Sequence, residues 1–83
     1  MNGEKVLSIT VLTFGPLAEI LGWKRKEFEF VQNTRIEEAV RILGLPSVQL
    51  LGLLFAVNGV QCSSETVLQT GDELALLPPV SGG

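Results

Sequence analysis

Apolar and polar residues alternate from position 6 to position 14, the pattern of a β-strand with one face in the core. The set expected to face the core is Leu7, Ile9 and Val11. The opposite set begins polar but ends apolar, with Leu12 and Phe14, which is unusual for a face in water. This strand therefore predicts a second apolar surface near its end.

A short helix and a second strand are predicted next. Gly15-Pro16 ends the first strand, and residues 17–21 can form one or two helical turns that end at Gly22. The alternation of Phe and Glu over residues 27–30 indicates a strand with its phenylalanines inward. We interpret the basic run Lys24-Arg25-Lys26 as a solvated loop. The pattern leaves open whether Trp23 packs on the core or lies on the surface.

The main helix has the strongest periodicity in the chain. Thr34 followed by Glu37 fits a capping box at its start. Gly44 and Pro46 fit its end. Apolar residues at helical spacing form one stripe, made of Ile36, Ala39, Val40 and Leu43. A stripe of this width requires a sheet to pack against.

The C-terminal half reads as strands joined by short connections. Residues 47–53 suggest a helical turn, residues 54–57 a buried strand, and Asn58-Gly59 a tight hairpin turn into residues 60–62. A connector over residues 63–70, in which Val67 and Leu68 point inward, leads to a last alternating strand, residues 73–77, with Leu74 and Leu76 inward. This order predicts an α+β fold, a ubiquitin-like β-grasp whose mixed sheet wraps around one main helix.

A distinctive tail follows the last predicted strand: Pro78, Pro79, Val80, Ser81, Gly82 and Gly83. Proline lacks the N–H donor of a strand, so we predict a domain of residues 1–77 and an extended, flexible tail of residues 78–83. Glycines without a Cβ can enter a narrow channel. A terminal carboxylate is ionised and a poor electrophile, so the pattern indicates a group that a partner activates, for example as a mixed anhydride with AMP.

Composition narrows the function classes. Eighty-three residues make one domain, and the hydrophobic fraction of 46% implies apolar surface left for a partner. The net charge of −3 gives no electrostatic case for nucleic acid. The absence of His and Tyr removes the commonest general base and metal ligand, so we expect no catalysis by the chain itself, no metal and no bound cofactor.

Cysteine use and hydropathy predict the compartment. The single cysteine, Cys62, excludes an internal disulfide and suits a reducing cytosol, and its apolar surroundings favour buried packing over a role as a sulfur relay. The start of the chain lacks the features of a signal peptide. Residues 42–64 are uncharged but are interrupted by Pro46 and Asn58-Gly59, so we expect a soluble, cytoplasmic protein without a membrane segment.

The tail and two other segments resemble one known family. The run Gly71-Asp72-Glu73-Leu74-Ala75-Leu76-Leu77-Pro78-Pro79-Val80-Ser81-Gly82-Gly83 is similar to the terminal signature of the small, sulfur-carrying subunit of molybdopterin synthase. The segments Phe14-Gly15-Pro16-Leu17-Ala18-Glu19-Ile20-Leu21-Gly22 and Ala56-Val57-Asn58-Gly59 also resemble that family. The resemblance spans almost the whole chain, and the Pro-Pro-Val-Ser-Gly-Gly ending is its most specific part.

The resemblance implies a sulfur carrier in a heterotetrameric sulfurtransferase complex. A ubiquitin-activating-like adenylyltransferase would adenylate Gly83 with ATP, and a sulfur donor would convert it to a thiocarboxylate. The tail would then enter the large subunit and deliver sulfur to a cyclic pterin phosphate. In this scheme Gly82 allows the tail to enter the channel of the large subunit. Val80 and Ser81 line that channel, and Pro78 and Pro79 belong to the same tail.

The resemblance also implies that the first and last strands pair in parallel. Leu12, Phe14, Ala75 and Leu77 would then form an apolar partner interface at the base of the tail, whereas a sheet covered on both sides would bury them instead. Ordering Val80 to Gly83 in a channel costs roughly 4–8 kcal/mol, while one buried Leu or Phe returns about 1.5–3 kcal/mol, so such an interface is needed.

Other function classes remain open from the sequence. A thiamine-type sulfur carrier would use a thiazole-forming synthase as its partner. A protein modifier would join Gly83 to lysines through an isopeptide bond. A plain β-grasp interaction domain would keep its function after deletion of Gly82-Gly83.

Overall fold

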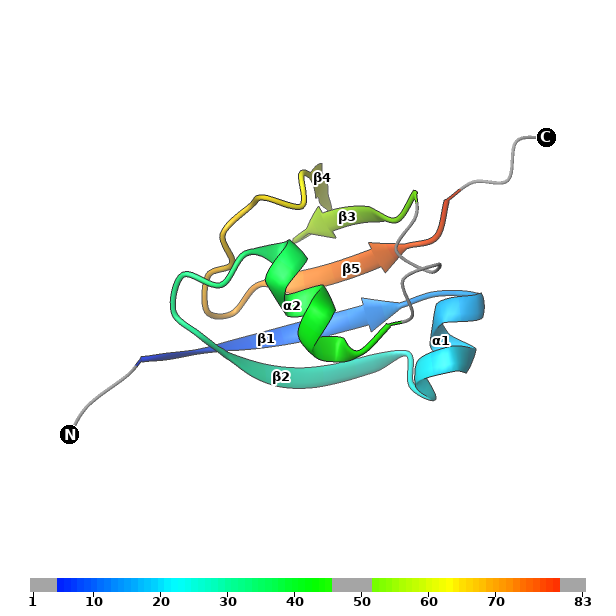
Figure 1. Ribbon diagram of the computed structural model, residues 1–83, viewed down its shortest axis with the longest axis horizontal. Helices are drawn as coiled ribbons and strands as arrows, with labels where there is room; N and C mark the ends of the chain where they lie inside the picture. The colour runs from blue at the N-terminus through cyan, green and yellow to red at the C-terminus, as the bar shows by residue number, and fades with distance from the viewer. Residues whose placement is uncertain (1–4, 46–51, 80–83) are drawn as a thin grey trace.

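A computed structural model describes residues 5–45 and 52–79. Its described elements are β1 (Val6–Thr13), α1 (Pro16–Leu21), β2 (Arg25–Val31), α2 (Ile36–Leu43), β3 (Leu54–Val57), β4 (Val60–Cys62) and β5 (Glu73–Leu77). The strands form one five-stranded sheet in the order β2-β1-β5-β3-β4, and α2 crosses one face of it (Figure 1). This is the predicted β-grasp.

The centre of the sheet is the parallel pair of β1 and β5. β1 pairs antiparallel with β2 on one side and parallel with β5 on the other, and β5 pairs antiparallel with β3. The parallel pairing confirms the prediction made from the family resemblance. It places the C-terminal ends of β1 and β5 at the same end of the sheet, where β5 leads into the tail (Figure 1).

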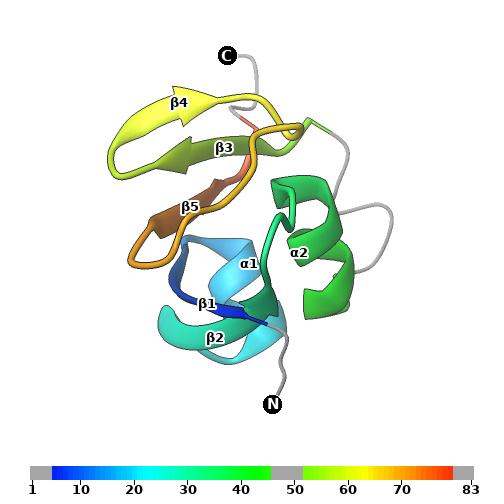
Figure 2. The ribbon, with the colours of Figure 1, turned by 90° about the vertical axis from the view of Figure 1, so that its left-hand side faces the viewer.

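The core lies between the sheet and α2, which occupies one side of the curved sheet in Figure 2. The apolar stripe of α2 meets the inward residues of the central strands because helical and strand periodicity each gather apolar side chains on one face. The most buried members of this core are Ile9, Val11, Ile36, Ala39, Leu74 and Leu76, all 0% exposed. The predicted inward sets of β1, α2 and β5 are therefore confirmed.

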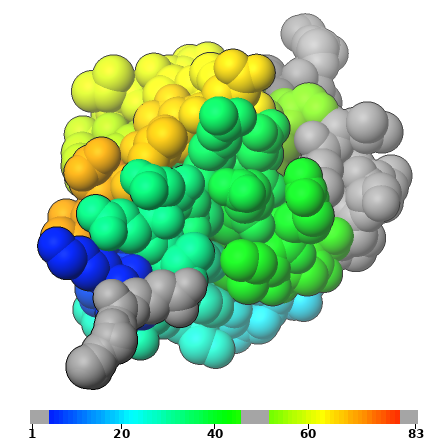
Figure 3. Space-filling view, turned by 60° about the vertical axis from the view of Figure 1, so that its left-hand side comes forward, coloured from blue at the N-terminus to red at the C-terminus, as the bar shows by residue number. Residues whose placement is uncertain are grey.

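The space-filling view shows α2 beside the connector that leads to β5 (Figure 3). The backbone N–H of Ile36 donates to Thr66 O, that of Glu37 to Ser64 O, and that of Leu68 to Thr34 O. Leu68 is buried, as predicted, while Val67 is 39% exposed, so only one of the two residues turns inward. The connector thus supplies partners to the N–H groups at the start of the helix, which have none within the helix itself.

The start of α2 differs from the prediction. The N-cap is Arg35, and its backbone N–H donates to Glu38 Oε1 at 2.9 Å, one position later than the predicted Thr34–Glu37 box. The Thr34 hydroxyl donates to Val31 O instead and is buried in the turn after β2. The side chain of Thr34 is thus used by the preceding turn, which moves the cap by one residue.

Three further predictions are corrected or left untested. The run Lys24-Arg25-Lys26 is exposed, as predicted, but only Lys24 lies in a loop, because Arg25 and Lys26 begin β2. The strand at residues 54–57 is not buried throughout, since only Ala56 is buried and Leu54 is 39% exposed. The helical turn suggested for residues 47–53 falls mostly outside the described residues. Trp23, left open above, is half-buried, with its ring centroid 5.4 Å from that of Phe28.

The hairpin between β3 and β4 turns at Asn58-Gly59, as predicted, with positive φ at both residues. The Asn58 side chain donates to Asp72 Oδ1 at 3.0 Å and accepts the backbone N–H of Glu73 at 3.0 Å. Asp72 Oδ2 also accepts the N–H of Gln69. These bonds tie the hairpin turn to the start of β5 and so fix the strand that leads into the tail.

No helix among the described residues has the length and apolar character needed to span a membrane.

Candidate functional site

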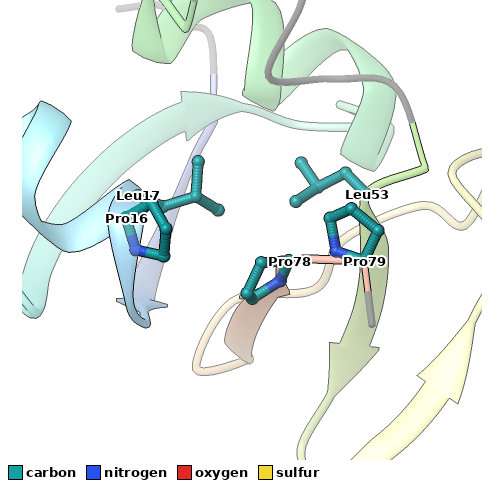
Figure 4. Close-up of a pocket in the computed structure, with 5 residues that line it drawn as sticks. All are labelled: Pro16, Leu17, Leu53, Pro78 and Pro79. Atoms are coloured by element: carbon teal, nitrogen blue, oxygen red, sulfur yellow. The ribbon is translucent and has the colours of Figure 1, made fainter. Parts of the chain in front are cut away.

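The first two tail residues lie beside an apolar pocket of the domain, with Pro78 half-buried and Pro79 exposed. Leu76 is 0% exposed and holds the end of β5 in the core. Beyond Leu77, Pro78 and Pro79 line a pocket of about 210 Å³ together with Pro16, Leu17 and Leu53. Figure 4 shows these side chains from three separate segments around one apolar hollow. Proline has a fixed φ, so the two prolines restrict the directions that the chain can take after Leu77.

Gly52 lies close to the second tail proline. It has a φ of +73°, and a Cβ added to it would lie 3.2 Å from Cβ of Pro79. A side chain at this position would therefore press on the second proline. No local sequence pattern distinguishes Gly52 as a site residue, because nothing in the neighbouring sequence indicates that residue 79 lies beside it.

A second feature beside the tail is the face of the sheet opposite α2. In the parallel pair, Leu12 lies next to Ala75, and in the antiparallel pair Leu77 lies next to Leu54 and Ala75 next to Ala56. Paired residues point to the same side of a sheet, so these five side chains share the outward face. We call them the apolar strip: Leu12, Leu54, Ala56, Ala75 and Leu77.

The structure brings together three of the four residues predicted for the partner interface and places two further residues beside them. Leu12, Ala75 and Leu77 are half-buried side by side on the outward face. Phe14 lies one residue beyond β1, is 45% exposed, and belongs to none of the described strand pairs. Leu54, which is 39% exposed, and Ala56, which is buried, were not predicted for this face, because a run of four apolar residues gives no alternation from which to assign an outward face.

The remaining predicted tail residues, Val80, Ser81, Gly82 and Gly83, lie outside the described residues. Cys62 is half-buried and packs against the edge of the core. Within the described ranges, 5–45 and 52–79, no three His, Cys, Asp or Glu side chains gather closely enough to hold a metal ion. The described part of the site is therefore an apolar surface beside the start of the tail.

Comparison with known proteins places this geometry among related folds. The model of the ThiS family matches residues 11–83. No curated protein sequence matches the chain.

Three solved structures illustrate the relationship. A chain in the complex of subunits 1 and 2 of molybdopterin-converting factor from Helicobacter pylori 26695 is 30% identical, with 93% of this chain and 100% of that chain covered and a TM-score of 0.61. SAMP1 from Haloferax volcanii is 26% identical, with 92% and 99% covered and a TM-score of 0.75. Urm1 from Trypanosoma brucei is 21% identical, with 100% of both chains covered and a TM-score of 0.70, which shows a shared fold.

Proposed function

The chain belongs to the ThiS family of ubiquitin-like sulfur carriers, and from that membership we propose that it is the sulfur-carrying small subunit of a molybdopterin synthase. The observation that carries this proposal is the 30% identity to a chain in the two-subunit molybdopterin-converting factor complex from Helicobacter pylori, over the full length of that chain. The Pro-Pro-Val-Ser-Gly-Gly ending of the sequence supports the same assignment.

The proposed chemistry takes place at the carboxylate of Gly83. An activating enzyme joins this carboxylate to AMP from ATP and releases pyrophosphate. A sulfur donor then displaces AMP, which leaves a thiocarboxylate on Gly83. In the active site of the large subunit, the sulfur passes to a cyclic pterin phosphate and the carboxylate is restored. The chain supplies the carrier group, and its partners supply the catalytic groups.

The site geometry supports this role in two ways. The fixed φ of Pro78 and Pro79, which line an apolar pocket with Pro16, Leu17 and Leu53, stiffens the start of the tail before it meets a partner. The apolar strip beside it offers area whose burial offsets the cost of ordering the tail, which is about 1–2 kcal/mol for each flexible residue. A carrier needs both, because the tail itself contains only one sizeable apolar side chain, Val80.

The test is the intact mass of the protein after incubation with ATP, a sulfur donor and its activating enzyme. We expect the mass gain of one sulfur replacing one oxygen, and we expect the loaded protein to form molybdopterin when the large subunit and the cyclic pterin phosphate are added. Deletion of Gly82-Gly83, or extension beyond Gly83, serves as the control and abolishes both signals. Pterin sulfuration that survives these changes would refute the proposal.

A second candidate function is protein modification. It is favoured by the 26% identity to a protein named as SAMP1, which a second solved structure describes as a small archaeal modifier protein. The same mass experiment distinguishes the two functions when it is run in a cell extract. A modifier gives adducts in which Gly83 is joined to lysine by an isopeptide bond, whereas a dedicated carrier gives only the sulfur-loaded chain.

A further inference from the structure

The hairpin turn between β3 and β4 consists of the dipeptide Asn58-Gly59. In an Asn-Gly pair the backbone nitrogen after the asparagine has little steric shielding, because glycine has no Cβ. This nitrogen can therefore attack the side-chain carbonyl carbon of the asparagine. Asn58 and Gly59 are both exposed, so water and solvent base have access to the turn.

The side-chain amide of Asn58 is held at both of its ends. Its Nδ2 donates to Asp72 Oδ1 at 3.0 Å, and its Oδ1 accepts the backbone N–H of Glu73 at 3.0 Å. Asp72 is fixed in turn, because its Oδ2 accepts the N–H of Gln69 at 2.8 Å. A reaction that removes Nδ2 must break the bond to Asp72, so it requires the turn to open locally.

We infer that Asn58 is a site of spontaneous deamidation, that the bond to Asp72 restrains this reaction in the folded protein, and that the product loosens the hairpin from β5. The inference is independent of the proposed function, because the reaction needs only water and involves no partner. It concerns the end of β5 opposite to the tail, since Asp72 precedes Glu73, the first residue of that strand.

The reaction has two steps. First, the Gly59 nitrogen forms a bond to Asn58 Cγ and gives its proton to solvent base, while the bond from Cγ to Nδ2 breaks and Nδ2 takes up a proton and leaves as ammonia. Second, one water molecule opens the resulting succinimide ring at either carbonyl, which gives aspartate or isoaspartate. The net change is one water consumed and one ammonia released, with no oxidation or reduction.

The product places one carboxylate against another. The nitrogen that donated to Asp72 at 3.0 Å is replaced by an oxygen that only accepts and that shares a negative charge. Like charges this close repel, and Asp72 makes no ion pair within residues 5–45 and 52–79 that would offset the repulsion. Isoaspartate also adds one carbon to the main chain of the turn, which disturbs the pairing of Val57 with Val60.

The first test follows the conversion of Asn58 by peptide mapping and mass spectrometry at mildly alkaline pH. A peptide map is needed because the chain has a second Asn-Gly pair, Asn2-Gly3. The native protein is compared with the same protein unfolded in urea and with Asp72→Ala. The matched control, Glu65→Ala, removes the same charge from an exposed side chain of the connector. Circular dichroism verifies that both variants are folded.

We expect Asn58 to react at least about tenfold more slowly in the native protein than in urea. Folded Asp72→Ala should react roughly twofold to tenfold faster than the native protein, because one bond that keeps the turn closed is lost. Glu65→Ala should stay within about twofold of the native rate, and all three proteins should react at the same rate in urea.

The second test measures the consequence of the reaction with Asn58→Asp, which reproduces the aspartate product. In urea titrations we expect its folding equilibrium constant to fall roughly 5- to 30-fold below that of the native protein. Adding Asp72→Asn to this variant should recover most of the loss, because one amide and one carboxylate again face each other.

Each part of the inference has a result that would overturn it. Absence of conversion at residue 58 in urea would exclude the site. Equal rates in native and unfolded protein, or equal rates in folded Asp72→Ala and Glu65→Ala, would exclude the restraint. A double variant no more stable than Asn58→Asp would show that repulsion from Asp72 does not loosen the hairpin.

Discussion

The contact between Gly52 and Pro79 yields a prediction that separates folding from presentation of the tail. In Gly52→Ala the new Cβ lies 3.2 Å from Cβ of Pro79, so one of the two must move. Pro79 is exposed and is followed by the tail, whereas Leu53 next to Gly52 is buried in the core. We therefore expect Pro79 to yield and the tail to lose its fixed starting direction.

The matched control is Gly59→Ala in the hairpin turn. Gly59 has a φ of +84°, close to the +73° of Gly52, but a Cβ there meets nothing within 4 Å. Both alanines pay the left-handed backbone cost, about 1–2 kcal/mol of unfolding free energy each. Only Gly52→Ala also displaces Pro79, and because the φ of proline is fixed, ordering this residue again on docking costs only about 0.5–1 kcal/mol, or roughly 2- to 5-fold in the efficiency of tail transfer.

Urea unfolding and the kinetics of thiocarboxylate formation give the two readouts. We expect the two variants to lose similar unfolding free energy, and only Gly52→Ala to lose kcat/KM with the activating enzyme. Equal kcat/KM for both variants would show that packing of Pro79 does not direct the tail. A much larger loss of stability in Gly52→Ala would show that the core, and not the proline, absorbs the clash.

Three further substitutions probe the core, the hairpin and the apolar strip. Leu76→Ala removes a fully buried side chain and should lower the unfolding free energy by about 2–5 kcal/mol in urea titrations; a loss below 1 kcal/mol would contradict its place in the core. Asn58→Ala removes the bonds to Asp72 and to the N–H of Glu73, so we expect about 1–3 kcal/mol less stability, while the exposed neighbour Gln61→Ala changes little. Leu12→Ser should weaken binding to the large subunit at least fivefold by calorimetry, because it removes an apolar contact worth about 1–2 kcal/mol. Val60→Ser, at an exposed apolar residue on the edge strand β4, should not weaken it. Equal affinity of the two serine variants would exclude the apolar strip as the interface.

Local patterns predicted most of the elements. The alternation in β1 and β5 and the stripe of α2 identified the buried faces, because strand and helix periodicities depend only on neighbouring residues. Asn58-Gly59 identified the hairpin, since both residues tolerate the positive φ that the turn requires. The cap of α2 was misplaced by one residue, because Thr34 bonds to the preceding turn, and its local sequence is compatible with either position.

The site itself was only partly predictable. Leu12, Ala75 and Leu77 were assigned to one surface because their strands alternate and because the family resemblance supplied the parallel pairing. Leu54 joined them only through its register with Leu77, and an apolar run does not specify register. The pocket around Pro78 and Pro79 draws residues from positions 16, 17 and 53, and no spacing in the chain relates those segments to the tail.

The sequence by itself determined the elements, their buried faces and the chemistry of the chain ending, because each depends on residues close together in the chain. Tertiary structure alone decided that Gly52 lies close to the second tail proline and that Leu54 extends the apolar strip. Those relations arise from strand order and register, which bring distant segments within contact distance and which short-range patterns leave free.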